Sequence, residues 1–289
     1  MYDQAQGLRE IVKKQIDQSL KQTRIVTVTS GKGGVGKSNF ALNFALGLIQ
    51  AGKKVVILDV DLGLANIEVL MGVSPKSYLL DLIEQDKTIW DVLEKGPNGL
   101  EFISGGTGFS HLLELNEVQL NRFFEKMAAL NGYADFVIID TGAGLTKQSL
   151  SFIMAADDVV LVTTPEPTSI TDAYAVVKLV SAHEPSVKFK MVVNRVGNPR
   201  EGKMAFDKLA LVSKKFLNLE ISSLGYMHDD SHVSRAVKQQ TPFFLAYPGS
   251  IASLGIKDLV HSYLEGTVQS IHVPRGVKGF LKRLMSHMR

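Results

Sequence analysis

A glycine-rich segment with two lysines is the part of this chain whose residue types most directly predict chemistry. It reads, in order, Gly31, Lys32, Gly33, Gly34, Val35, Gly36, Lys37 and Ser38. It lies between an apolar run at 25–29 and a helical pattern at 39–50, which is the strand–loop–helix context of a P-loop. Such a loop points backbone N–H groups at phosphate oxygens, and the helix N-terminus, which opens here at Asn39, adds partial positive charge. We expect residues 31–39 to bind the phosphates of a nucleotide.

The two lysines of this loop predict different roles. Lys37 is placed to reach the β- and γ-phosphates, and the Ser38 hydroxyl is placed to bind Mg²⁺. Lys32 stands at the start of the loop and points away along it, so it cannot easily reach the γ-phosphate of its own site. A surface lysine without a role is the alternative at this position.

Acidic residues at strand ends predict the metal side of the site. Asp59 and Asp61 close the run at 55–60, and their spacing of two puts both side chains on one side of the strand. That position is the carboxyl edge of the sheet, where ligands bind in open α/β folds. Asp59 is expected near the water shell of Mg²⁺, Asp61 beside the attacking water, and Asp140, which ends the run at 136–139, as a Walker-B carboxylate. Ordinary capping of the strand ends is the alternative.

Two further segments predict movement and base recognition. Thr141, Gly142, Ala143 and Gly144 follow Asp140, and their glycines would let the backbone move when the γ-phosphate leaves. Asn194, at the end of the run at 189–193, is a candidate for contact with adenine, and residues 225–230 are candidates for the other wall of the base pocket. A simple β-turn and a turn asparagine are the alternatives.

Short runs rich in β-branched residues alternate with helical patterns from residue 24 onward. Strands are expected at 25–29, 55–60, 100–104, 136–140, 159–163, 189–194 and 221–225, and helices at 39–50, 117–130 and 170–182. Continuous apolar strands separated by helices are typical of a parallel sheet covered on both faces. We therefore expect an α/β fold with a doubly wound, mostly parallel sheet. Residues 107–115 and 197–203 are expected as loops, and Trp90 in the core.

Both ends of the chain differ from this body. Residues 1–22 carry apolar residues near helical spacing, which predicts a helical arm before a body at 23–273. Residues 274–289 form a basic tail, in which one helical face would hold Val277, Phe280, Leu281, Leu284, Met285 and Met288, with Lys278, Lys282 and Arg283 around it. Such a helix is expected to bind an anionic membrane surface. Packing of this helix against the body is the alternative.

Composition and charge exclude several classes of protein. Without cysteine there are no disulfides, thiolate zinc sites, cysteine-ligated iron–sulfur clusters or cysteine nucleophiles, and the seven histidines show no metal-ligand spacing. The net charge of +3 comes from residues 266–289, which hold five Lys or Arg and no acidic residue, while the remainder has a net charge of −2. A neutral body disfavours nucleic acid as a partner. No pattern of a signal peptide or membrane span is found, so we expect a cytoplasmic protein.

Together these motifs resemble the MinD/ParA family of dimerising P-loop ATPases. The resemblance rests on SGKGGVGKS at 30–38, DVDLGLAN at 59–66, DTGAG at 140–144 and KGFLKRL at 278–284, which is similar to the membrane-targeting helix of MinD. It implies a P-loop NTPase fold, ATP or ADP with Mg²⁺, and an ATP-dependent homodimer in which Lys32 crosses to the partner's nucleotide. The switch residues that it implies are Asp61, Asn66, Asp140, Gly142 and Gly144. Gly142 stands where the usual DxPAG switch has proline.

The arm resembles the DQAxxLR activator motif of the FlhG group in this family, the flagellar-number regulators also called FleN or YlxH. Residues 3–9 read DQAQGLR, so Asp3, Gln4, Leu8 and Arg9 match the motif. The resemblance implies docking on FlhF, a signal-recognition-type GTPase, with Gln4 in its active site, and flagellar C-ring components as further partners. It favours a slow ATPase switch, reversibly attached to the inner face of the cell membrane. A division-site MinD and a ParA-type DNA partition ATPase are the alternatives.

Overall fold

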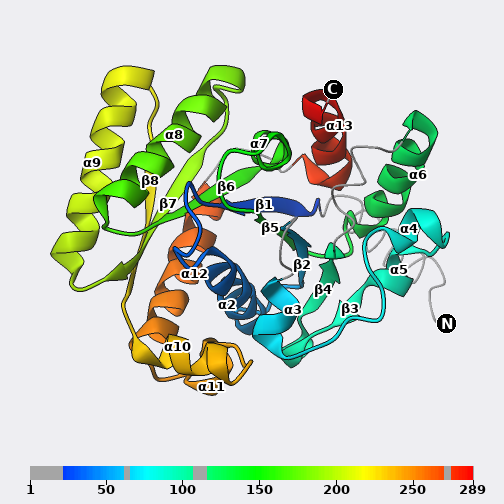
Figure 1. Cartoon of the computed structure of the whole chain (residues 1–289), viewed down its shortest axis with the longest axis horizontal. Helices are drawn as coiled ribbons and strands as arrows, with labels where there is room; N and C mark the ends of the chain where they lie inside the picture. The colour runs from blue at the N-terminus through cyan, green and yellow to red at the C-terminus, as the bar shows by residue number, and fades with distance from the viewer. Residues whose placement is uncertain (1–21, 62–65, 107–115, 270–274, 289) are drawn as a thin grey trace, which may run out of the picture.

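A mostly parallel sheet runs through the centre of the protein in the computed structural model, which describes residues 22–61, 66–106, 116–269 and 275–288 (Figure 1). The eight strands follow the spatial order β3-β4-β2-β5-β1-β6-β7-β8, and only β3 with β4 is antiparallel. The strands are β1 (Arg24–Thr29), β2 (Val55–Val60), β3 (Glu94–Lys95), β4 (Glu101–Ser104), β5 (Phe136–Thr141), β6 (Asp158–Thr163), β7 (Phe189–Val196) and β8 (Ser222–His228). The predicted α/β sheet is confirmed.

Helices cover both faces of the sheet (Figure 1). On one face α2 and α12 pack through aromatic side chains such as Phe40, Phe44 and Tyr263. The other face is covered by α6, α7 and α13 beside β1, β2 and β5, and by α8 and α9 beside β6 and β7. The helices are α2 (Lys37–Gln50), α3 (Asn66–Met71), α4 (Asp81–Glu84), α5 (Ile89–Val92), η1 (Pro97–Gly99), α6 (Glu117–Met127), η3 (Ala128–Leu130), α7 (Lys147–Ala155), α8 (Pro167–His183), α9 (Pro199–Leu217), α10 (Ser231–Lys238), α11 (Phe243–Ala246), α12 (Ile251–Gln269) and α13 (Gly276–Met288).

The register of the central strands positions the site. β2, β5 and β6 are buried along their whole length, which accounts for their continuous apolar sequences. Asp59 on β2 pairs with Asp140 on β5, and Asp140 also pairs with Val28 on β1. The carboxyl ends of these three strands therefore meet at one edge, directly beside the loop that follows β1.

Two sequence expectations about local structure are wrong. Residues 197–203 are not a loop, because α9 begins at Pro199, where the Asn198 side chain accepts a hydrogen bond of 3.0 Å from the Glu201 N–H. Trp90 is not a core residue, since its side chain is 48% exposed. Its ring instead lies on the surface against Tyr133, with ring centroids 4.6 Å apart. The expected loop at 107–115 and the arm at 1–21 lie outside the described residues.

The C-terminal helix is docked on the body. Val277, Phe280, Leu281 and Leu284 of α13 are at most 4% exposed, and Phe280 stacks on Phe152 of α7 with centroids 6.1 Å apart. Met285 is half-buried in the same cluster, whereas Lys278 and Lys282 face solvent. The alternative interpretation of the tail, packing on the body, is therefore what this structure shows. Among the described helices, none has the length and apolar character needed to cross a bilayer.

Candidate phosphate and magnesium site

The P-loop between β1 and α2 depends on glycine at three positions. Gly34 and Gly36 have φ angles of +79° and +89°, in the left-handed region that favours glycine. At Gly31 a side chain would collide with the Asp172 backbone of α8, because a Cβ there would lie 2.2 Å from it. No side chain caps the N-terminus of α2, so its first N–H groups are available for phosphate.

A buried ion pair lies beneath this loop. The Lys37 Nζ is 2.6 Å from Asp140 Oδ1, with side chains 6% and 0% exposed, and it also donates to the Ser38 hydroxyl at 3.3 Å. The other Asp140 oxygen, Oδ2, is buried and has no hydrogen-bond partner among the described residues. Burial raises the pKa of Asp140, and the charge of Lys37 opposes that rise. Three predicted site residues are thus brought together.

These donors fit Mg²⁺ bound with a nucleotide. Mg²⁺ takes oxygen ligands and in such sites usually keeps waters and phosphate oxygens besides one or two protein groups. The unpartnered Asp140 Oδ2 and the Ser38 hydroxyl are oxygen donors of this kind, next to the loop expected to hold the phosphates. These two oxygen atoms are of the type that Mg²⁺ binds, and binding of Mg²⁺ by Ser38 and Asp140 stays a prediction.

Asp59 holds backbone rather than presenting free oxygens. Its Oδ1 accepts from the Asp61 N–H at 3.1 Å, and its Oδ2 accepts from the N–H groups of Asn66 at 3.0 Å and Ile67 at 3.1 Å. It therefore fixes both ends of the segment between β2 and α3. Burial, together with the nearby negative charge of Asp140, raises the pKa of Asp59 to about 7.

The raised pKa of Asp59 predicts how the stability of the metal-free protein depends on pH. The pKa of Asp59 is 3.8 in the unfolded chain and about 7 in the folded protein, so between these pH values the folded state binds more protons than the unfolded state. Its contribution to stability is fully present below pH 3.8 and is lost as pH rises through 7. The thermal midpoint without nucleotide or Mg²⁺ should therefore fall between about pH 4 and about pH 7 more steeply in the wild type than in Asp59→Asn. Equal pH dependence of both proteins would contradict this assignment.

The second lysine of the loop points to a different element. The Lys32 Nζ is 3.4 Å from Glu166 Oε2 and 3.3 Å from the Thr168 hydroxyl, at the start of α8, and its side chain is 43% exposed. Lys37 forms a buried ion pair with Asp140, whereas Lys32 pairs with Glu166 at the surface. Glu166 and Thr168 were not identified from the sequence, since no motif marks them.

The predicted switch residues meet beside the loop. Asn66 Nδ2 donates to Asp61 Oδ2 at 3.2 Å, and a Cβ at Gly142 would lie 3.3 Å from Asp61 Oδ1. The N–H of Gly144 donates to the Ser30 carbonyl at 3.1 Å. Residues 141–146 then lead directly into α7, the helix against which α13 is docked.

Asn194 contacts the P-loop itself. Its Nδ2 donates to the Val35 carbonyl at 2.8 Å, and its Oδ1 accepts from the Arg195 N–H at 2.9 Å. A Cβ at Gly36 would lie 2.4 Å from Asn194 Nδ2, so this asparagine and the glycine fit together. Contact of Asn194 with adenine stays a prediction.

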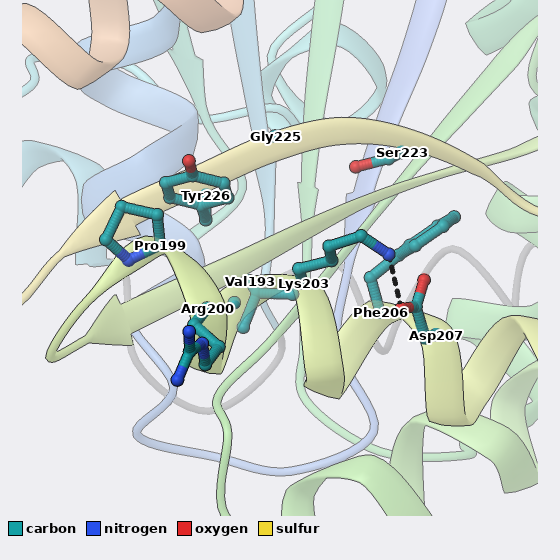
Figure 2. A pocket seen from close by; sticks show the side chains of 10 residues that line it. Val193, Pro199, Arg200, Lys203, Phe206, Asp207, Ser223, Gly225 and Tyr226 are labelled. Atoms are coloured by element: carbon teal, nitrogen blue, oxygen red, sulfur yellow. Dashed lines mark hydrogen bonds and ion pairs between the residues drawn. The ribbon is translucent and has the colours of Figure 1, made fainter.

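A half-open groove lies next to this region, between β8 and α9 (Figure 2). Its volume is about 530 Å³, and its lining includes Val193, Arg200, Lys203, Phe206, Ser223 and Tyr226. Lys203 is paired with Asp207 at 2.6 Å. Of the expected base-pocket wall at 225–230, Gly225 and Tyr226 line this groove, whereas Asp230 caps α10 through the His232 N–H. The P-loop residues do not take part in its lining.

This fold and this site define a P-loop NTPase. The chain matches the ParA family, described as NUBPL iron-transfer P-loop NTPase, over residues 21–263. It belongs to the ParA/MinD family of P-loop NTPases.

Within this family the chain is similar to proteins of flagellar regulation and of septum placement. The chain is 36% identical over 273 residues to the antiactivator FleN of Pseudomonas aeruginosa, covering 93% of this chain and 96% of FleN. It is 32% identical over 271 residues to the flagellum site-determining protein YlxH of Helicobacter pylori, covering 92% and 91% of the two chains. The septum site-determining protein MinD from Pyrococcus horikoshii, solved with Mg-ADP, shares the fold with a TM-score of 0.69 and 24% identity, covering 86% of this chain and 100% of that chain. The family resemblance predicted from the motifs is confirmed.

Proposed function

We propose that this chain is an ATP-hydrolysing switch that controls flagellar number. The observation that carries the proposal is the continuity of one segment, in which Asp140 lies under the P-loop, residues 141–146 lie beside Asp61, and α7 supports the docked tail. The flagellar part is supported by similarity to FleN and YlxH over more than nine-tenths of this chain. The segment from Asp140 to the end of α7 would thus connect the nucleotide site to the docked α13.

The residues of the site suggest how ATP is bound and cleaved. The N–H groups of residues 33–38 would bind phosphate oxygens, and Lys37 would exchange its partner Asp140 for the β- and γ-phosphates. Ser38 and Asp140 would hold Mg²⁺, which neutralises negative charge on the phosphates when bound. Asp61, oriented by Asn66, would align the attacking water.

Lys32 would complete the site in a dimer. With ATP bound, it leaves Glu166 and Thr168 and reaches the γ-phosphate of a second copy, where its charge stabilises the transition state. Because the pair with Glu166 is exposed, breaking it costs little. Hydrolysis to ADP removes the γ-phosphate that Lys32 binds in the second copy, so the two copies separate.

The tail would convert dimerisation into membrane attachment. Releasing the four buried apolar side chains of α13 into water would cost roughly 2 kcal/mol each, whereas burying them in the lipid interface recovers most of this cost. One tail should therefore bind weakly. Two tails on one dimer gain avidity of about 10²–10⁴ through effective concentration.

Charge reversal on the exposed side of α13 tests the membrane role without disturbing its docking. Lys278→Glu with Lys282→Glu should reduce ATP-dependent sedimentation with phosphatidylglycerol vesicles at least about tenfold, because each lysine contributes about 1 kcal/mol at an anionic surface. Both side chains are exposed, so the fold should be kept. Lys214→Glu with Lys215→Glu, an equally exposed pair on α9, serves as the control. Equal sedimentation of both variants and the wild type would argue against a membrane-binding tail.

The proposed flagellar partner is tested with the arm alone, which lies outside the described residues. A peptide of residues 1–20 should accelerate GTP hydrolysis by FlhF, and Gln4→Ala should remove most of the acceleration. A scrambled peptide is the control. Absence of acceleration would count against FlhF as the partner.

Isolation of the full chain with ATP from a flagellated bacterium separates the three candidate functions. Recovery of FlhF and C-ring components is expected. Recovery of division proteins would favour a MinD role, and recovery of DNA with a steep salt dependence would favour a partition ATPase.

A further inference from the structure

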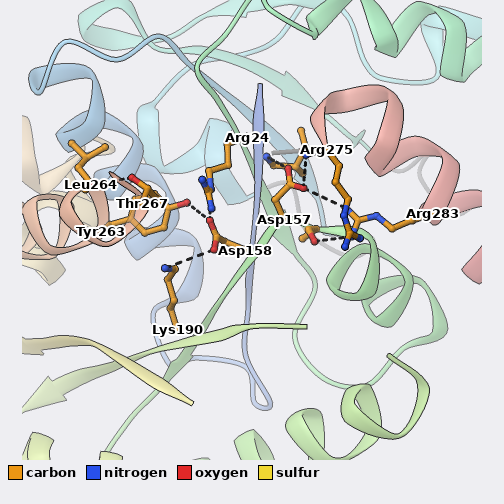
Figure 3. A network of polar contacts seen from close by, with 11 residues as sticks. Arg24, Asp157, Asp158, Lys190, Tyr263, Leu264, Thr267, Arg275 and Arg283 are labelled. Atoms are coloured by element: carbon orange, nitrogen blue, oxygen red, sulfur yellow. Dashed lines mark hydrogen bonds and ion pairs between the residues drawn. The ribbon is translucent and has the colours of Figure 1, made fainter. Parts of the chain in front are cut away.

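Asp157, in the turn between α7 and β6, contacts both ends of the described chain (Figure 3). Its Oδ2 accepts from the Ile25 N–H at 3.0 Å, at the start of β1. Its Oδ1 accepts from the Arg275 N–H at 3.1 Å and lies 3.4 Å from Arg283 Nη2, both from the tail. The same guanidinium donates to the Ala156 carbonyl at 3.3 Å. One buried carboxylate thus joins the strand that follows the arm to the helix expected to bind membrane.

A second contact joins the same two segments through the turn at 130–134. The Thr23 hydroxyl donates to the Ala134 carbonyl at 2.7 Å and accepts from the Gly132 N–H at 2.8 Å. In the same turn, Asn131 Oδ1 accepts from the Val277 N–H at 3.1 Å, in the first turn of α13. The first residues of the body and the first residues of α13 are therefore fixed by the same short turn.

The neighbouring residue Asp158 has its hydrogen-bond partners in the body and not in the tail. Asp158 is bound by Arg24 Nε at 2.5 Å and by the Tyr263 hydroxyl of α12 at 2.8 Å (Figure 3). These partners belong to the body and not to the tail. Loss of the tail would therefore leave Asp158 satisfied, while Asp157 would lose all its donors on one oxygen. Asp157 is therefore the residue that joins the start of β1 to the tail.

We propose that Asp157 and Asn131 couple the tail to the start of the body, so that detachment of α13 loosens residues 22–25, the segment that follows the arm in the sequence. The proposal rests on the proposed function only for what each end binds. Its physical content is that the two segments contact the same carboxylate and the same short turn, so the free energy that couples loosening of one segment to loosening of the other is equal in both directions.

Hydrogen exchange of the full chain, without nucleotide, lipid or GTPase, tests this coupling. Arg283→Gln and Lys282→Gln each remove one positive charge from α13, but only Arg283 contacts Asp157. Arg283→Gln should accelerate exchange about tenfold both in α13 and in residues 22–26, because a charge-assisted hydrogen bond to a buried carboxylate is lost. Lys282→Gln should leave both segments as in the wild type. Acceleration confined to α13 would overturn the coupling.

Two further variants approach the junction from its other sides. Asp157→Asn should loosen both segments, because an amide has one acceptor oxygen where the carboxylate uses two. Thr23→Val, which removes the hydroxyl contacts of Thr23 with the turn at 130–134, should accelerate exchange at the start of α13. Unchanged exchange of α13 in Thr23→Val, with an unchanged thermal midpoint, would also overturn the proposal.

The outcomes separate this inference from the proposed function. Coupled exchange without vesicle binding or GTPase stimulation would leave the junction standing and refute the membrane and FlhF roles. In the wild type, phosphatidylglycerol vesicles with ATP should accelerate exchange of residues 22–26, and phosphatidylcholine vesicles should not. Vesicle binding without that acceleration would refute the coupling and keep the membrane role.

Discussion

Lys32→Ala should hydrolyse ATP about a thousandfold more slowly than the wild type, because a positive charge supplied from a second subunit accelerates phosphoryl transfer by about 10³–10⁵. The loss should fall on turnover and not on folding. Within the described part of the subunit, the Lys32 side chain donates to Glu166 and Thr168, and it is 43% exposed. The thermal midpoint and the affinity for ADP should therefore stay near the wild-type values.

Turnover per subunit, measured against protein concentration, checks this expectation. The wild type should show turnover that rises with concentration as dimers form, and Lys32→Ala should stay low throughout. Lys238→Ala, at an exposed lysine on α10, is the matched control and should behave as wild type. Wild-type turnover in Lys32→Ala would remove the reason to assign this lysine to a second copy.

Lys37→Met should have the largest combined effect, with nucleotide affinity reduced roughly a hundredfold or more through loss of charge-assisted bonds to phosphate. Removal of one partner of a buried ion pair also costs about 3–5 kcal/mol of stability. In this protein the substitution removes the lysine that pairs with Asp140 Oδ1, while Asp140 stays fully buried and its Oδ2 has no hydrogen-bond partner among the described residues. Denaturant unfolding without nucleotide and ADP titration calorimetry measure the two losses.

A double variant separates the two effects of Lys37. Lys37→Met with Asp140→Asn replaces the orphaned carboxylate by a neutral amide of the same shape, so most of the lost stability should return. Nucleotide binding should not return, because both phosphate and metal contacts are missing. If the double variant is as unstable as Lys37→Met alone, the pair with Asp140 is not the source of the instability.

The candidate site could be predicted from the sequence because its residues follow local rules. A glycine-rich loop between a strand and a helix has few other uses, and in a parallel sheet the carboxyl ends of the strands, where Asp59 and Asp140 stand, meet at one edge. The start of α9 could have been predicted as well. Asn198, Pro199 and Glu201 occupy the positions of a cap, a first-turn proline and a third helical residue, although a loop was expected at 197–203.

Other features could not be predicted because they depend on what lies opposite a side chain. An amphipathic pattern describes the apolar face of α13 but not its partner, and both a lipid surface and the apolar side chains of the body beside α7 satisfy it. The three backbone N–H groups that Asp59 accepts from could not be predicted from the strand pattern either, and its expected place near the water shell of Mg²⁺ stays a prediction. Glu166 as the contact of Lys32 and Asp157 as the contact of Arg283 join residues more than a hundred positions apart, which no spacing rule reaches.

Mixing two inactive variants tests the central claim most directly. Lys32→Ala keeps its own Asp61, and Asp61→Ala keeps its Lys32, so a mixed dimer has one site with both groups if the lysine acts across the interface. Randomly mixed equal amounts should regain about a quarter of wild-type ATP turnover, since about half of such C2 dimers are mixed and each has one complete site. If the mixture stays as inactive as each variant alone while light scattering shows that mixed dimers form, Lys32 does not serve the nucleotide of a second copy.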